Sequence, residues 1–137
     1  MKIALIGCVK LKNNYKCKAR DMYISPLFIK SLAYVEKKIK PDKIYILSAK
    51  YELLPENKVI EPYEKTLNKM KSAERKIWAN NVIEQLKKES NLEKDTFYVL
   101  AGSKYIENIK PHIKNCIDAM HGLSQGRRLQ FLNNELC

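Results

Sequence analysis

The chain alternates short, continuous apolar runs with longer segments whose apolar residues recur at helical spacing. Three of the runs are KIALIGCV (Lys2–Val9), KIYILS (Lys43–Ser48) and TFYVLA (Thr96–Ala101). A run that is apolar throughout predicts a strand covered on both faces, as in a parallel sheet. A shorter run, Asn115–Met120, predicts a fourth strand.

Helical spacing fills the segments between these runs. The first helix opens at Pro26, which suits a first turn, and ends near Lys40, because the residue before Pro41 is disfavoured in a helix. Its apolar stripe is Phe28, Leu32, Val35 and Ile39. A second helix is predicted between Lys71 and Lys88, with a stripe of Trp78, Val82 and Leu86 beside Ala79 and Ile83. A long polar connection with Pro55 and Pro62 precedes it.

Two shorter helices follow the third and fourth strands. Gly102 and Ser103 offer a turn and an N-cap before an apolar stretch that Pro111 shortens or kinks. Ser124 is placed to cap a final helix through Leu129, Leu132 and Leu136. Strand alternating with helix predicts an α/β fold, a three-layer αβα sandwich around a mostly parallel four-stranded sheet.

The length of 137 residues predicts one domain, residues 1–137. No apolar run approaches the roughly 18 residues of a membrane span, and the N-terminus is too short and too strand-like for a signal peptide. We therefore expect a cytoplasmic protein with no membrane partner. The sequence leaves the oligomeric state open.

The chain carries 26 Lys and Arg against 15 Asp and Glu, a formal net charge of +11. This excess favours partners that bear phosphate, such as a nucleotide or nucleic acid. Only four of the cationic residues are arginine, so an ordinary lysine-rich surface is the alternative. The four cysteines show no CxxC pairing, and two histidines are a weak signal for zinc, so we expect neither a metal nor another cofactor.

The position of a ligand site follows from the predicted sheet. In open parallel sheets, ligands bind outside the carboxyl ends of the strands, near the point where strand order reverses. This rule selects residues 7–12, 48–52, 102–105 and 121–128. Together these segments carry thiol, amine, hydroxyl, carboxylate, imidazole and guanidinium groups.

The segment after the first strand, GCVKLKNNYKCKARDMY, is unusually cationic. Its lysines either meet a phosphate or carboxylate at the sheet edge or form a solvated loop. Cys8 is either a reactive thiolate beside these cations or a small core residue at a strand end. Asp21 either caps the first helix or acts as a carboxylate base, and Tyr23 and Tyr63 either stack on a base or roof the core.

The segment HGLSQGRRLQFL, from His121, has features of a phosphate site. Gly122 and Gly126 allow close backbone approach, and the start of a helix presents unpaired N–H groups. Of Arg127 and Arg128, at most one can face the same ligand, because neighbouring helical residues diverge by about 100°. The alternative is a glycine turn before a helix with two solvated arginines.

Several motifs resemble those of a small bacterial, archaeal and phage family of unknown function. They are Cys-x-x-x-Lys at Cys8–Lys12, Ala-Arg-Asp-x-Tyr at Ala19–Tyr23, Leu-Ser-Ala-Lys-x-x-Leu-Leu at Leu47–Leu54, Pro62-Tyr63, Ala101-Gly102-x-x-Tyr105 and Gly122-Leu123-x-x-Gly126. The chain departs from the family in having Val9 for a serine and Glu52 for a glycine. More distantly, it is similar to a uracil-DNA-glycosylase-like domain of archaeosine tRNA-modifying enzymes, which implies that fold and a link to modified bases.

Two functional hypotheses follow. The first is an enzyme acting on a nucleotide, nucleobase or nucleic acid, with an N-glycosidic bond as one candidate target. There a carboxylate would face the sugar, and cations or N–H donors would face base and phosphate. Its expected catalytic residues are Asp21, Lys12 and Cys8, and Tyr23 and Tyr63 would stack on a base. The residues expected to bind phosphate or ligand are Lys10, Arg20, Ser48, Lys50, Gly102, Tyr105, Gly122, Gly126 and Arg127. The second hypothesis is a binding module that uses the same basic edge without chemistry.

Overall fold

The computed structural model describes residues 1–137 and contains a five-stranded, mostly parallel sheet between helices. The strand order is β4-β3-β1-β6-β7. The parallel strands are β1 (Lys2–Gly7), β3 (Lys43–Ser48), β6 (Thr96–Leu100) and β7 (Asn115–Ile117). The α/β class and the mainly parallel sheet are therefore as the sequence predicts.

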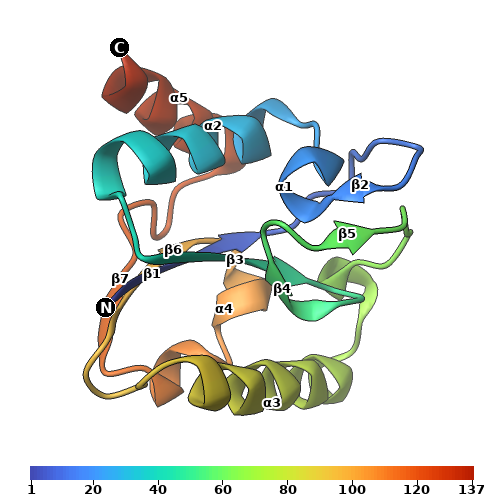
Figure 1. Cartoon of the computed structure of the whole chain (residues 1–137), viewed down its shortest axis with the longest axis vertical. Coiled ribbons are helices and arrows are strands. Elements are labelled where there is room, and N and C mark those ends of the chain that lie inside the picture. The colour runs from blue at the N-terminus through green and yellow to red at the C-terminus, as the bar shows by residue number, and fades with distance from the viewer.

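The helices lie on both faces of this sheet (Figure 1). One face is covered by α2 (Pro26–Tyr34) and α5 (Gln125–Leu136), and the other by α3 (Ser72–Glu89) and α4 (Ser103–Ile106). The smaller elements are α1 (Ala19–Met22), the π-helical turn η1 (Val35–Ile39) and the 3₁₀ turns η2 (Leu67–Lys69) and η3 (Lys110–His112). None of the helices combines the length and apolar character needed to cross a membrane.

The fifth strand, β4 (Glu52–Pro55), corrects the prediction of a four-stranded sheet. It pairs antiparallel with β3 and buries Leu53 and Leu54, although the sequence pattern predicts a polar connection here. The tight turn places Glu52 at φ +62, which a residue other than glycine adopts at a cost of about 1 kcal/mol. Asn81 Nδ2 and Gln85 Nε2 of α3 donate to its carboxylate at 2.8 and 2.9 Å, which offsets that cost.

The predicted helices are confirmed with small changes of boundary. Phe28, Leu32, Val35 and Ile39 are all buried, as are Trp78, Ala79, Val82, Ile83 and Leu86. Ser25 caps α2 by accepting from the Phe28 N–H at 3.3 Å, so Asp21 does not cap this helix. Ser124 caps α5 by accepting from the Arg127 N–H, as predicted. Pro111 lies in η3, which follows the short α4.

Strand order reverses at β1, and this opens the sheet edge. From β1 the chain runs to α2 on one face, and from the adjacent β6 it runs to α4 on the other face (Figure 1). The loops after these two strands consequently separate, which creates the crevice where ligands bind in folds of this class. At its base, a Cβ on Gly7 would lie 3.0 Å from Ala101 Cβ.

Replacement of Gly7 by alanine is predicted to destabilise the fold by about 1–3 kcal/mol, because the added methyl group overpacks against Ala101. Gly102 is the matched control, since a Cβ there meets nothing within 4 Å and its φ is negative. Urea unfolding should show a lower midpoint for Gly7→Ala than for Gly102→Ala. Equal midpoints for the two variants would contradict the close approach of Gly7 to Ala101.

Candidate functional site

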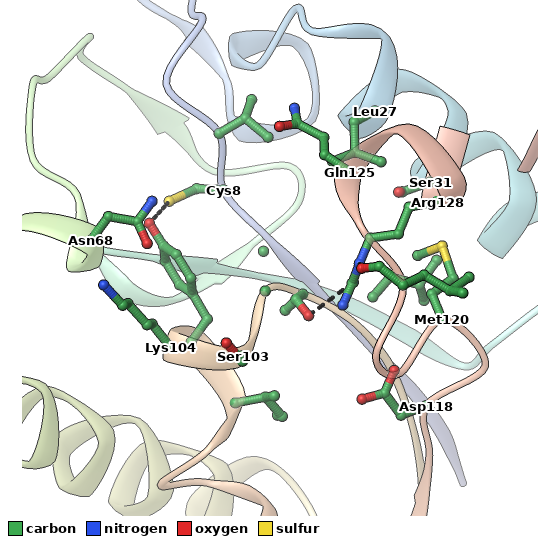
Figure 2. Close-up of a pocket in the computed structure, with 18 of the residues that line it drawn as sticks. Cys8, Leu27, Ser31, Asn68, Ser103, Lys104, Asp118, Met120, Gln125 and Arg128 are labelled. Atoms are coloured by element: carbon green, nitrogen blue, oxygen red, sulfur yellow. Dashed lines mark hydrogen bonds between the residues drawn. The ribbon is translucent and has the colours of Figure 1, made fainter. Parts of the chain in front are cut away.

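A pocket of about 860 Å³ opens at the carboxyl edge of the sheet, at the crevice between the loops after β1 and β6. Its walls come from residues 7–10 after β1, 100–107 around the start of α4, and 118–125 after β7, with Arg128 from α5. Leu27, Phe28 and Ser31 of α2 and residues around η2 close the sides (Figure 2). The rule for parallel sheets thus locates this pocket.

Asp118 supplies a buried carboxylate in this pocket. It directly follows β7, its side chain is only 6% exposed, and Figure 2 shows it pointing into the hollow. Its Oδ2 lies 3.7 Å from Lys110 Nζ and 3.6 Å from His121 Nδ1. Its Oδ1 is buried and has no hydrogen-bond partner in the protein. An unsatisfied buried oxygen costs about 1–3 kcal/mol, so a hydrogen bond from a donor that reached Oδ1 would be favourable.

Arg128 ties two walls of the pocket together. Its Nε donates to the Leu123 carbonyl at 3.0 Å and its Nη1 to the Ala101 carbonyl at 3.1 Å. The second of these bonds is drawn in Figure 2. Because a guanidinium has five N–H donors, three remain for a ligand. We predicted that Arg127 binds the ligand. Arg127 is exposed and does not line the pocket, because adjacent residues of a helix point in different directions.

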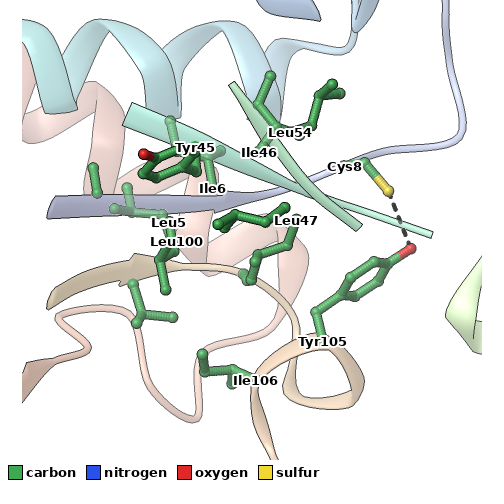
Figure 3. Packing of buried hydrophobic residues seen from close by; sticks show 14 of the residues in the cluster. Leu5, Ile6, Cys8, Tyr45, Ile46, Leu47, Leu54, Leu100, Tyr105 and Ile106 are labelled. Carbon is green, nitrogen blue, oxygen red and sulfur yellow. Dashed lines mark hydrogen bonds between the residues drawn. The ribbon is translucent and has the colours of Figure 1, made fainter. Parts of the chain in front are cut away.

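Cys8 and Tyr105 meet beneath the loops after β1 and β6. The Cys8 thiol donates to the Tyr105 hydroxyl at 3.3 Å, and both side chains are buried against the apolar core (Figure 3). Burial, and then the negative charge that Cys8 would carry, raise the pKa of Tyr105. Tyr105 therefore stays protonated at neutral pH and presents an intact hydroxyl to Cys8.

Tyr63 lies at the centre of a buried hydroxyl chain. Ser48 Oγ donates to Tyr63 Oη at 2.8 Å, and Tyr63 and Tyr23 share a hydrogen bond of 2.6 Å. The Tyr23 ring is 1% exposed and packs against Phe28 at 4.9 Å between centroids. Tyr23 therefore has no free face on which a base could stack, which corrects that prediction. Tyr63 is also buried, so both rings form part of the hydrophobic core.

Lys12 covers this tyrosine cluster. Its ammonium lies 4.6 Å from the centre of the Tyr63 ring and donates to the Lys10 carbonyl at 3.1 Å. Partial burial lowers the pKa of Lys12, while attraction to Cys8 and Glu64 acts in the opposite direction. Lys12 is thus held against the tyrosines and near Cys8, but it does not line the pocket.

The structure brings together part of the predicted set. Cys8, Lys10, Gly102, Tyr105 and Gly122 all line the pocket. The predicted residues that do not line it are Lys12, Arg20, Asp21, Tyr23, Ser48, Lys50, Tyr63, Gly126 and Arg127. Asp21 is exposed, Ser48 is fully buried in the hydroxyl chain, and Lys50 lies over the Tyr51 ring at 5.3 Å.

Arg20 forms ion pairs that hold two segments of the chain together. Its guanidinium pairs with Glu56 at 2.5 Å and with Glu36 at 2.8 Å. The hydrogen bond to Glu36 is the main cause that raises the pKa of Arg20, and the charges of Glu36 and Glu56 raise it further. Arg20 thus joins the connection around β5 (Val59–Ile60) to η1, and its charge is already balanced.

A family model described as Family of unknown function (DUF6884) matches residues 3–134. The chain belongs to this family. No curated protein and no solved structure shows a significant match. The description of the family carries no activity, so the chemistry of the site in this DUF6884 protein is argued from its own residues.

Sequence reasoning missed Asp118 in this DUF6884 chain, and it named Arg127 rather than Arg128 as the arginine that binds the ligand. The fourth strand was predicted to run to Met120, whereas it ends at Ile117. The carboxyl-edge rule was therefore applied three residues too late and passed over Asp118. An acidic residue immediately after a short apolar run was the available signal. Nothing in the sequence distinguished Arg128 from Arg127 until the rotation of α5 was known.

The buried tyrosines predict a loss of stability at alkaline pH. Desolvation, the largest cause in each case, raises the pKa of Tyr23, Tyr63 and Tyr105 above the ordinary value of 10.0. Above that pH the unfolded chain releases protons that the native protein keeps, so stability falls as pH rises. The slope is up to about 1.4 kcal/mol per pH unit for each tyrosine.

Urea unfolding on either side of the ordinary tyrosine pKa measures this effect. The midpoint should drop above that value, and the drop should be smaller for Tyr105→Phe than for the parent protein. A midpoint that stays constant across the alkaline range would contradict the burial of these hydroxyls.

Proposed function

We propose that the chain is an enzyme that binds a nucleotide in this pocket and cleaves its N-glycosidic bond. The observation that carries the proposal is the pairing of Asp118, whose buried Oδ1 has no partner, with the anchored guanidinium of Arg128 in one hollow. A free acceptor suits a sugar hydroxyl or an attacking water, and a guanidinium suits a phosphate.

The size and walls of the pocket suit a ligand as large as a nucleotide. Small-molecule sites measure about 300–1,000 Å³, and this pocket of about 860 Å³ lies in that range. Ten of its 26 lining residues are hydrophobic, so it offers an apolar side as well as a polar one. Leu27, Met120 and Leu123 form apolar surface against which a base can lie.

Positively charged side chains around the pocket would bind the phosphate group of the nucleotide. Lys10, Lys69, Lys104 and Arg128 line it, and Lys10 and Lys104 form no ion pair with any carboxylate of the protein. Arg128 is held in place before any ligand arrives, because two backbone carbonyls accept from it. A donor that is already oriented binds an anion with less loss of side-chain entropy.

The chemistry follows from the charges that develop as the bond breaks. The C1′–N bond breaks with its electron pair moving to the base, and positive charge grows on the sugar. The Asp118 carboxylate stabilises that charge and takes a proton from a water whose oxygen bonds to C1′. The departing base then receives this proton, so the products are a free base and a sugar phosphate.

Incubation with a panel of nucleoside 5′-monophosphates, followed by chromatography of the bases, tests this reaction. Release of a free base together with a sugar phosphate is the expected result. A panel in which no nucleotide binds, or in which a nucleotide is consumed without release of its base, would overturn it.

The second candidate is a nucleotide-binding module that uses the same pocket without chemistry. The net charge of +11 favours it, because positive charge alone is enough to bind a phosphate. Calorimetric binding of a nucleotide, with no product by mass spectrometry, would select this function.

A further inference from the structure

A cationic extension stands beside the pocket and has no role in the proposed reaction. It comprises residues 10–18, which lead into β2 (Cys17–Lys18), and the facing residues Lys58 and Val59; we call it the basic arm. β2 pairs antiparallel with β5 outside the main sheet (Figure 1).

The basic arm is an ordered surface held by backbone hydrogen bonds. The Asn13 N–H donates to the Met22 carbonyl at 2.8 Å, and the Ile24 N–H donates to the Leu11 carbonyl at 3.1 Å. The Ala19 N–H donates to the Lys58 carbonyl at 2.8 Å. A ligand would therefore meet side chains whose backbone is already fixed.

Positive charge on the arm is unbalanced. The sequence from 10 to 18, KLKNNYKCK, holds four lysines and no acidic residue. Lys10, Lys16, Lys18 and Lys58 are exposed, and none of them forms an ion pair. The nearby Glu56 is already paired with Arg20.

Apolar groups are exposed among these lysines. Tyr15 is 58% exposed, Leu11 is 56% exposed and Val59 is 50% exposed. Tyr15 forms no hydrogen bond through its hydroxyl and packs against no other aromatic ring. An exposed aromatic ring between unpaired cations is the arrangement that binds single-stranded nucleic acid, in which phosphates meet the cations and bases stack on the ring.

We propose that the basic arm binds a single-stranded polynucleotide and leads one of its nucleotides into the pocket. Lys10 makes the arm continuous with the pocket, because it begins the arm and also lines the hollow. This inference rests on the proposed function for the pocket and names its substrate class, a nucleotide within a strand. An acidic peptide would match the lysines but would leave Tyr15 without a stacking partner.

Fluorescence anisotropy with labelled oligothymidine and oligouridine of about 12 nucleotides tests the arm, because single-strand sites span about this length. The double variant Lys16→Ala/Lys18→Ala should weaken binding about tenfold and reduce the salt slope by about 1.4, since each phosphate contact contributes about 0.7. Tyr15→Ala should weaken binding about tenfold through lost stacking. Comparison of the two oligonucleotides shows whether DNA or RNA binds more tightly, and either preference supports the arm.

The matched control is Lys37→Ala/Lys38→Ala in η1, which removes the same charge from exposed residues that belong to neither the arm nor the pocket. It should change binding less than twofold, apart from a small general effect of net charge. Equal losses in both double variants would overturn the inference, as would a protein that binds anionic lipid vesicles but neither oligonucleotide.

Titration with a nucleoside 5′-monophosphate separates the arm from the pocket. The arm variants should bind the mononucleotide as the parent protein does. Mononucleotide binding without oligonucleotide binding would overturn the arm and leave the pocket standing. Oligonucleotide binding that depends on Tyr15 and Lys16, without mononucleotide binding, supports the arm and would overturn the proposed function of the pocket.

Discussion

Replacement of Asp118 by asparagine should reduce release of the base by at least about 10²–10³-fold, the usual effect of removing a group that stabilises transition-state charge. Asparagine keeps the shape of the side chain but cannot hold the proton taken from water. The measurement is the rate of base release from the nucleotide that the parent protein cleaves best.

Asp118→Asn should leave the fold intact, which separates this effect from unfolding. The contacts of Asp118 with Lys110 and His121 are long, at 3.7 and 3.6 Å, and Oδ1 has no partner to lose. Lys110 and His121 are 39% and 76% exposed and stay solvated without the carboxylate, so we expect the free energy of unfolding to change by less than about 1 kcal/mol. Asp21→Asn is the control, because Asp21 is exposed and outside the pocket. If Asp21→Asn abolished activity and Asp118→Asn did not, the assignment of the carboxylate would be wrong.

Replacement of Arg128 by alanine should weaken nucleotide binding by about 10–100-fold, because hydrogen bonds to charged groups contribute about 1.5–3 kcal/mol. The variant should also lose some stability, since the carbonyls of Leu123 and Ala101 lose their donors. Calorimetric titration measures the affinity, and urea unfolding measures the stability.

Arg127→Ala is the matched control for this change. It removes the same charge from the adjacent residue, which is exposed and outside the pocket. Its affinity should stay within about twofold of the parent value, as expected of a screened surface charge. Arg128→Lys should recover part of the affinity but not all of it, because an ammonium lacks the planar fork of donors. Equal losses for Arg127→Ala and Arg128→Ala would show that only net charge matters.

Much of the fold follows from hydrophobic pattern alone. The continuous apolar runs at Lys2–Val9 and Lys43–Ser48 predict buried parallel strands, and the stripes of α2 and α3 predict which faces are buried. β4 was missed because Leu53 and Leu54 are only two apolar residues between polar neighbours. A tertiary contact, the pairing of β4 with β3, makes that segment a strand.

The site was predictable in location but not in detail. The carboxyl-edge rule places Cys8, Lys10, Gly102, Tyr105 and Gly122 together, and all of them line the pocket. It does not say which side chains are already satisfied. Arg20 is paired with two glutamates and Tyr23 is hydrogen-bonded to Tyr63, contacts between segments far apart in sequence. Such pairings exist only after the chain has folded.

A crystal structure of the protein soaked with a nucleoside 5′-monophosphate tests the central claim most directly. The account predicts electron density in the hollow between the loops after β1, β6 and β7, with the phosphate against Arg128 and a sugar hydroxyl or bound water on Asp118 Oδ1. Density confined to the basic arm, or a pocket that stays free of nucleotide at saturating concentration, would contradict it.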